Sequence, residues 1–195
     1  MKKQHIIIFL ILSLIFYFPS SLLAQGPENS TGRDGKIKWY SFEDAYALCK
    51  KKPRKMIVDV YTEWCGWCKR MDSETFTNPV IVKYMNSHFY CVKLDAERKD
   101  TIILDGTKLV NPNPASKRST HQLANQLLHN SMSYPSYVFL NDRGNFITTV
   151  PGYHQPREFE AILSFIGEDA YVKSTAEEFQ KTFDDYISRF RGEIK

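Results

Sequence analysis

The stretch MIVDVYTEWCGWCKRM, residues 56–71, decides the fold of this 195-residue chain. Its first six residues are apolar apart from Asp59, which is typical of a buried strand, and a short turn then leads into a helix that carries Cys65 and Cys68 in its first turn. Unpaired backbone N–H groups and the helix dipole favour a thiolate at a helix start. The stretch therefore predicts a strand, turn and helix that present a cysteine pair for redox chemistry.

The N-terminal residues have the pattern of a secretory signal peptide. In residues 1–24, Lys2 and Lys3 precede an apolar run, and Ala24 stands at the expected cleavage point. The run at residues 6–18 is shorter than the roughly 20 residues that span a bilayer, so an uncleaved membrane anchor is the less favoured alternative. We expect a periplasmic or secreted protein without a stable membrane span after cleavage, in which disulfides are chemically permitted.

Composition and charge limit the expected class of protein. The hydrophobic content of 43% is enough at this length to bury the core of one domain with additions. The formal charge of +4 falls to +2 once residues 1–24, which hold two lysines and no acid, are removed. This near balance gives no reason to expect nucleic acid or an anionic membrane as a partner.

The order of predicted elements is that of an α/β domain. Residues 25–36 are polar and predict a flexible leader. Strands and helices then alternate, which favours parallel neighbouring strands, and an antiparallel hairpin and a helix opened by Pro156 follow. The expected elements are a strand at 37–40, a helix at 42–51, a strand at 56–61, the cysteine helix, a helix at 79–86, strands at 90–94, 137–140 and 146–150, and a helix that ends at 167.

Two segments add to this layout. Residues 96–119 contain a hairpin signal at Asp105-Gly106, and an insertion of this length is often functional. Residues 168–195 form a C-terminal extension, in which Ser174 and Glu177 predict a capping box before a helix with an aromatic face. We expect this face to pack on its own domain, with a dimer contact as the alternative.

Taken together, residues 37–167 resemble the thioredoxin superfamily. The motif Trp64-Cys-Gly-Trp-Cys68 is similar to the active-site motif of the family, Asp59 stands six residues before the first cysteine as the buried acid of the family does, and Pro135 is similar to its cis-proline. The resemblance implies a thioredoxin fold, with a central mixed sheet flanked by helices, an inserted hairpin and an extra C-terminal helix.

The sequence also departs from the thioredoxin pattern. Gly66-Trp67 stands between the cysteines where thioredoxin has Gly-Pro, and the insertion has no counterpart in a minimal thioredoxin. The family often keeps a lysine near its buried acid, and that position is assigned here to Cys91, with Lys93 two residues further on.

The cysteine pair and Asp59 are the expected catalytic residues. Cys65, at the helix start and nearer solvent, is expected to attack a client disulfide, and Cys68, more buried and with a higher pKa, is expected to resolve the mixed disulfide. An isolated carboxylate in an apolar strand should have a raised pKa, which would let Asp59 take the proton from Cys68. The alternative is an acid at a strand end that is exposed to water or bound to a lysine.

The expected client-binding residues surround the pair: Trp64, Gly66, Trp67, Tyr134 and Pro135. A cis-Pro135 would present the neighbouring backbone to an extended client, whereas an ordinary trans-proline would only open a strand. The two tryptophans would supply apolar surface around the thiol, although Trp67 fits a core position equally well.

The other two cysteines, Cys49 and Cys91, face inward by pattern and are expected to be buried free thiols, with a structural disulfide as the alternative. A metal site is disfavoured, because among the four cysteines only Cys65 and Cys68 have ligand spacing. We expect no cofactor other than the redox-active disulfide of that pair.

The resulting hypothesis is a thiol:disulfide oxidoreductase of the cell envelope. Its partners would be protein clients with disulfides or thiols, and an unidentified redox partner protein. We favour a reductant, because no histidine lies between Cys65 and Cys68 to stabilise the thiolate further. The alternative is a non-catalytic binding module in which the same fold holds an envelope protein and the dithiol is structural.

Overall fold

The computed structural model describes residues 35–195 apart from 173 and 176. The expected signal peptide and residues 25–34 of the expected leader lie outside the described residues. Within the described part, no helix is long and apolar enough to cross a membrane.

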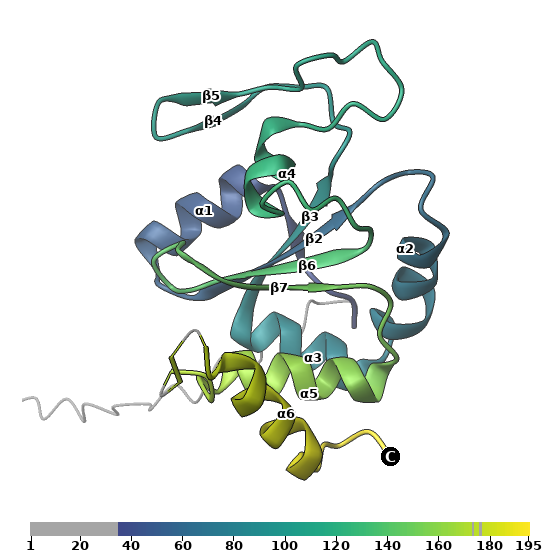
Figure 1. Ribbon diagram of the computed structural model, residues 1–195, viewed down its shortest axis with the longest axis vertical. Helices are drawn as coiled ribbons and strands as arrows, with labels where there is room; N and C mark the ends of the chain where they lie inside the picture. The colour runs from purple at the N-terminus through teal and green to yellow at the C-terminus, as the bar shows by residue number, and fades with distance from the viewer. Residues whose placement is uncertain (1–34, 173, 176) are drawn as a thin grey trace, which may run out of the picture.

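A five-stranded mixed sheet forms the centre of the domain, in the order β1-β3-β2-β6-β7 (Figure 1). The first three strands in this order are parallel to one another, and β6 and β7 continue the sheet antiparallel. Their bounds are β1 Trp39–Tyr40, β3 Phe89–Asp95, β2 Lys55–Tyr61, β6 Ser136–Leu140 and β7 Phe146–Pro151. The predicted thioredoxin fold is confirmed, with β2 at the centre of the sheet, which explains why it is almost entirely apolar.

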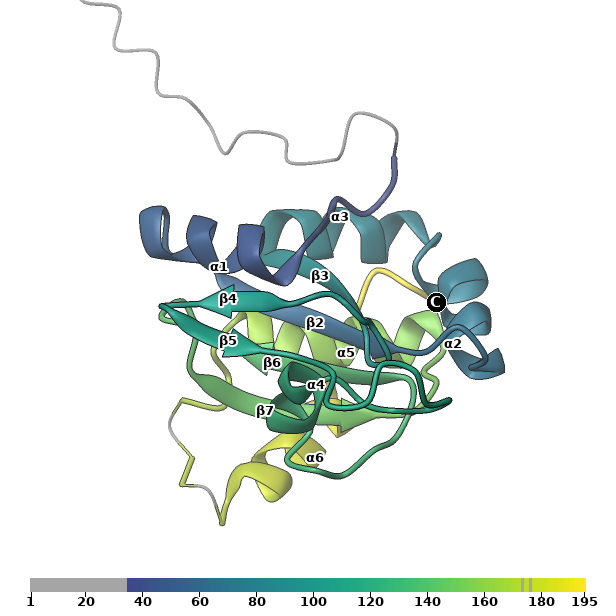
Figure 2. The same cartoon turned by 90° about the horizontal axis from the view of Figure 1, so that it is seen from above.

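Helices cover both faces of the sheet (Figures 1 and 2). On one face lie α1 (Phe42–Lys51) and α4 (Gln122–Leu127), and on the other lie α3 (Pro79–His88) and α5 (Pro156–Gly167). Successive residues of β2 point to opposite faces. Val58 therefore packs in the core on the α1 side, whereas Ile57 packs on the α3 and α5 side, which is also the side of Asp59.

Local capping residues determine where α1 and α3 begin. The Ser41 hydroxyl accepts a hydrogen bond from the Asp44 N–H at 3.0 Å and starts α1. The Asn78 side chain accepts from the Val80 N–H at 3.0 Å and starts α3, with Pro79 in its first turn. Both starts agree with the sequence prediction, and α3 runs two residues beyond its predicted end.

The insertion at residues 96–119 folds onto the α1 side of the domain. Its hairpin, β4 (Ile102–Leu104) and β5 (Thr107–Leu109), turns at Asp105 and Gly106, which both have positive φ, as the sequence predicts. Ile102 is fully buried in the core of that side. The loop after the hairpin is held by Asn111, whose side-chain amide donates to the backbone carbonyls of Arg98 and Ser119. The insertion is thus a folded part of the domain.

The C-terminal extension packs on its own domain, as expected. Helix α6 (Phe179–Arg189) places the rings of Phe179 and Phe183 at 5.5 and 5.2 Å from the ring of Phe165 on α5. The predicted capping box is wrong by one residue. The reciprocal bonds join Thr175 and Glu178, while the Ser174 hydroxyl donates to the Tyr171 carbonyl instead.

Candidate active site

The cysteine pair follows the C-terminal end of β2, at the start of α2. Figure 1 shows this helix directly after the central strand. Helix α2 (Gly66–Arg70) has Cys65 as its N-cap residue, and the Cys65 sulfur accepts a hydrogen bond from the Cys68 N–H at 3.1 Å. The helix continues as a π-helix, η1 (Met71–Thr75). Its Phe76 N–H donates a hydrogen bond to the carbonyl of Met71, five residues earlier. The sequence predicts a helix through Met71 but not this change of winding.

Cys65 and Cys68 are joined by a disulfide, with 5.3 Å between their α-carbons. Their exposed fractions are 4% and 3%, so exposure does not distinguish the two residues in the disulfide form. The assignment of Cys65 as the nucleophile therefore depends on its place before the first helical turn, where unpaired N–H groups favour a thiolate.

Asp59 is buried on β2 and forms an ion pair with Lys93. Its side chain is 3% exposed, and Oδ2 lies 2.7 Å from the Lys93 ammonium nitrogen, whereas Oδ1 has no hydrogen-bond partner among the described residues. Burial raises the pKa of Asp59 to about 6, against the opposing attraction of Lys93. Both sequence-based expectations apply in part, because the acid is buried with a raised pKa and is also bound to a lysine.

The lysine position assigned from the sequence is wrong. In the parallel pairing of β2 with β3, Asp59 lies opposite Lys93, and Cys91 lies opposite Ile57. Residues 91 and 93 share a face of β3, so only the strand register, which is set by long-range packing, decides which of them meets the acid.

Directly before the first cysteine, Trp64 is the centre of a cluster of side chains that we call the first wall. Trp64 is 52% exposed, its indole N–H donates to Glu97 Oε1 at 2.8 Å, and the Arg118 guanidinium lies 4.9 Å from its ring centre. The Tyr134 ring meets the Trp64 ring edge-on at 6.0 Å. This contact places the loop with the cis Tyr134-Pro135 bond, which the sequence predicts, next to the motif.

Directly before the second cysteine, Trp67 belongs to another cluster, which we call the second wall. Trp67 is 55% exposed, so the alternative of a core position is wrong. Its ring lies 5.5 Å from the Tyr153 ring, and the Arg70 guanidinium lies 5.5 Å from the Trp67 ring centre. Gly152, with φ +95°, donates its N–H to the Pro135 carbonyl at 2.8 Å and so joins this wall to the proline loop.

Gly66 lies exposed between the two cysteines. A β-carbon built there would meet no atom within 4 Å, so the glycine is not required by packing inside the domain. It leaves the surface beside the disulfide free of a side chain.

Sequence reasoning missed Glu97, Arg118 and Tyr153, which complete the two walls. Glu97 and Arg118 belong to the insertion, and its length was the available signal that it serves a function. Their meeting on Trp64 depends on how residues 96–119 fold back, which no local pattern encodes.

Cys49 and Cys91 are buried free thiols, as expected. They lie in different cores, on opposite faces of the sheet, which rules out a disulfide between them. The Cys49 thiol donates to the Asp142 carbonyl at 3.1 Å, and burial raises the pKa of Cys91. In residues 35–195 without 173 and 176, no group of three or more His, Cys, Asp or Glu side chains is placed to hold a metal ion.

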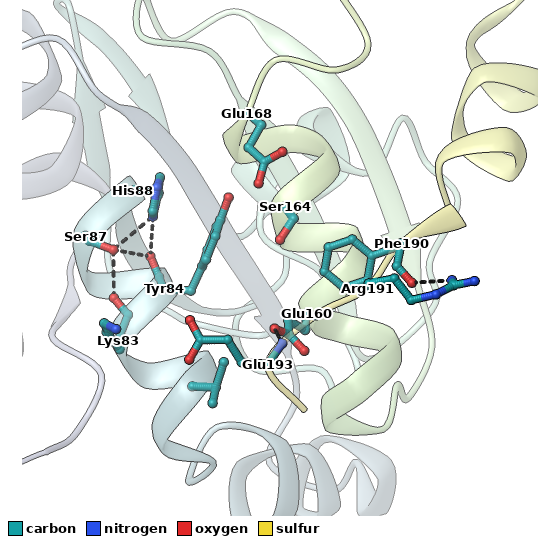
Figure 3. A pocket seen from close by; sticks show the side chains of 12 residues that line it. Lys83, Tyr84, Ser87, His88, Glu160, Ser164, Glu168, Phe190, Arg191 and Glu193 are labelled. Carbon is teal, nitrogen blue, oxygen red and sulfur yellow. Dashed lines mark hydrogen bonds between the residues drawn. The ribbon is translucent and has the colours of Figure 1, made fainter. Parts of the chain in front are cut away.

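A separate cavity of about 430 Å³ lies between α3, α5 and the last residues of the chain (Figure 3). Tyr84 and Ser164 face it from the two helices, and none of the site residues lines it. Glu160, in its wall, accepts the backbone N–H groups of Glu193 and Ile194 at 2.6 and 3.0 Å. This carboxylate therefore binds the C-terminal segment of the protein itself.

Comparisons with known proteins agree with the fold. A family model described as a thioredoxin-like domain matches residues 42–167. A thioredoxin-fold protein from Helicobacter pylori superposes with a TM-score of 0.54 at 18% identity, over 75% of this chain and 96% of that one. A thioredoxin from Thermus thermophilus gives 0.51 at 17%, over 67% and 87%. Mouse spermatogenesis-associated protein 20 is 30% identical over 67 residues, which are 34% of this chain but only 8% of that protein.

Proposed function

Because the chain belongs to the thioredoxin-like domain family, we propose that it is a thiol:disulfide oxidoreductase that exchanges disulfides with protein clients. The observation that carries this proposal is the disulfide of Cys65 and Cys68 at the start of α2, in a motif whose two tryptophans are both exposed. A purely structural disulfide would not need large apolar side chains turned to solvent next to its cysteines in the chain.

In the reducing direction, the reaction has two steps. The Cys65 thiolate attacks one sulfur of a client disulfide, so that a mixed disulfide forms and the other client sulfur leaves as a thiolate. Cys68 then loses its proton and attacks Cys65, which releases the second client thiolate and forms the disulfide seen in the structure. The client gains two electrons and the protein loses two, which a redox partner protein must restore.

Asp59 is suited to accept the proton from Cys68. A pKa of about 6 means that the carboxylate is ionised near neutral pH yet is a stronger base than an ordinary aspartate. Oδ2 is engaged by Lys93, whereas Oδ1 has no hydrogen-bond partner among the described residues and is the atom that we assign to the proton.

The two walls and the proline loop would bind the client. Trp64 and Tyr134 supply the aromatic rings of the first wall and Trp67 stands in the second, while Gly66 leaves the surface beside the disulfide free of a side chain. An extended client segment would pair with the backbone next to Pro135. Main-chain pairing would suit clients of varied sequence.

We place this activity in the cell envelope, because the N-terminal sequence predicts export, and disulfides persist in that compartment. The reducing direction is supported only by the motif, in which Gly66 and Trp67 add no charge beside the Cys65 thiolate. The reduction potential of the Cys65 and Cys68 pair distinguishes the two directions. A value of about −270 mV is expected for a reductant, and one of about −120 mV would identify an oxidant.

A Cys68→Ser variant tests the proposed function. Without the resolving thiol, mixed disulfides between Cys65 and envelope proteins should accumulate and disappear on reduction. The matched control is the double variant Cys65→Ser, Cys68→Ser, which should trap nothing. If the single variant traps no more than the double variant, the exchange reaction is wrong, and the alternative of a non-catalytic binding module takes its place.

A further inference from the structure

Lys93 is shared by two carboxylates. Its ammonium nitrogen lies 2.7 Å from Asp59 Oδ2 and also contacts Asp72 Oδ1. The side chain of Asp59 is 3% exposed and that of Asp72 is 45% exposed, with Lys93 between them at 21%. The lysine thus links the buried acid of the site to an acid in contact with solvent.

Aromatic rings hold the ammonium group at this point. The ring centres of Trp39, Tyr61 and Phe76 lie 5.1, 5.2 and 5.3 Å from the Lys93 nitrogen. Ring faces attract a cation, and more strongly when it is partly removed from water. The cage restricts the Lys93 ammonium to a position in which both carboxylates can reach it.

Asp72 owes its position to the helix that carries the cysteines. It lies in η1, four residues after Cys68, and residues four apart share a face of a helix. The winding changes to a π-turn at Met71, directly before Asp72, and such turns occur frequently at functional sites. The resolving cysteine and the second carboxylate are therefore positioned by one continuous helical segment, α2 followed by η1.

We propose that Asp72 is a positioning residue for the proton transfer, which keeps Asp59 a sufficiently strong base for Cys68 by competing for the Lys93 ammonium. This inference rests on the proposed function. Asp72 acts in two ways with the same sign, because it draws Lys93 away from exclusive pairing with Asp59 and adds a like charge near it. Each effect favours the protonated form of Asp59.

The electrostatics of the cluster agree with this role. Burial raises the pKa of Asp59, Lys93 opposes the rise, and Asp72 adds to it. For Lys93, burial opposes the charge, but Asp59 and Asp72 together raise its pKa. Two phenols also face the cluster: that of Tyr137, opposite Asp59 on β6, and that of Tyr61, beside Lys93.

Two substitutions in the same cluster should act in opposite directions. In Asp72→Asn, Lys93 pairs with Asp59 alone, so the pKa of Asp59 should fall by about half a unit or more, which is about a threefold change in its ionised-to-protonated ratio at fixed pH. In Lys93→Met, the pKa of Asp59 should rise. The matched control is Asp44→Asn, which removes the same charge from an exposed site on α1.

Two measurements separate this inference from a structural role. Carbon NMR of the Asp59 carboxyl in the oxidised protein gives its pKa directly. Release of client thiol from a preformed mixed disulfide, followed against pH, reports the Cys68 step, and its acid limb should move to lower pH in Asp72→Asn and to higher pH in Lys93→Met. Asp72→Ser should reproduce the result of Asp72→Asn, which guards against a local folding defect.

The inference is overturned if Asp72→Asn changes the Asp59 pKa no more than Asp44→Asn does, or raises it. It is equally overturned if the pKa falls while the acid limb stays in place, since Asp72 would then set a charge without serving the proton transfer. Failure of the proposed function looks different, because the wild-type protein itself would then release no client thiol.

Discussion

The buried carboxylate of Asp59 should make the folded protein less stable as the pH rises. Its pKa increases from the ordinary 3.8 to about 6 in the folded state. Between these values the native state keeps a proton that the unfolded chain has already lost, so stability falls as the pH rises through this window and then levels off. Each pKa unit corresponds to about 1.4 kcal/mol, which gives a total loss of about 3 kcal/mol. About 2.5 kcal/mol of this falls between pH 4 and pH 8, because the unfolded chain is already partly ionised at pH 4.

The Asp59→Asn variant isolates this contribution, because the amide does not titrate. Urea unfolding of the oxidised wild-type and variant proteins at pH 4, 6 and 8 gives the free energy of unfolding of each. From pH 4 to pH 8 the variant should gain about 2.5 kcal/mol relative to the wild type, whatever the constant cost of losing the pair with Lys93. Glu63→Gln, at an exposed site beside the motif, should follow the wild type within about 0.5 kcal/mol. Parallel pH curves for the wild type and Asp59→Asn would refute the assignment of a raised pKa to this carboxyl.

Three further results are expected. Trp64→Ala should slow exchange with protein clients by about tenfold, because these clients contact the first wall. Its rate of exchange with a small disulfide such as oxidised glutathione should stay within about twofold of the wild-type rate. Equal effects on both substrates would contradict this role of Trp64. In the reduced native protein, iodoacetamide should modify Cys65, because the helix start favours its thiolate, and should leave Cys49 and Cys91 unmodified; mass spectrometry of the labelled peptides checks this. Glu160→Ala should lower the free energy of unfolding in urea by about 2 kcal/mol, since two backbone N–H groups of the C-terminal segment lose their acceptor; an unchanged value would show that this contact adds nothing.

Features encoded within a few neighbouring residues could be predicted from the sequence. The apolar run of β2 followed by two cysteines predicts the unit of strand, turn and helix, because burial and helix initiation are both local patterns. Ser41 and Asn78 start their helices through bonds to N–H groups two or three residues on. Asp105-Gly106 likewise specifies its own hairpin turn, since both residues tolerate positive φ.

Features that depend on packing between distant segments could not be predicted. The register that brings Lys93 rather than Cys91 to Asp59 is a property of two paired strands and not of either one. The π-turn at Met71 likewise has no local sequence signal. Met71 and Phe76 are both buried in the core on the α3 and α5 side of the sheet, so the turn depends on packing with distant residues. The same limit applies to Trp67, whose spacing fits core and surface equally well until Tyr153 is seen beside it.

In the proposed reaction, client selection and proton transfer depend on two separate groups of residues. The first wall combines Trp64 with residues from the insertion and the proline loop. Among the described residues, no side-chain hydrogen bond or ion pair joins this wall to Asp59, Lys93 or Asp72. The cluster of these three residues includes Asp72 from the continuation of the cysteine helix, and aromatic rings surround its lysine. In the proposed reaction, substitutions such as Arg118→Ala should therefore change which clients react while leaving the pH profile of the Cys68 step intact. Substitutions in the cluster should do the reverse, so the two sets of variants test each part of the reaction independently.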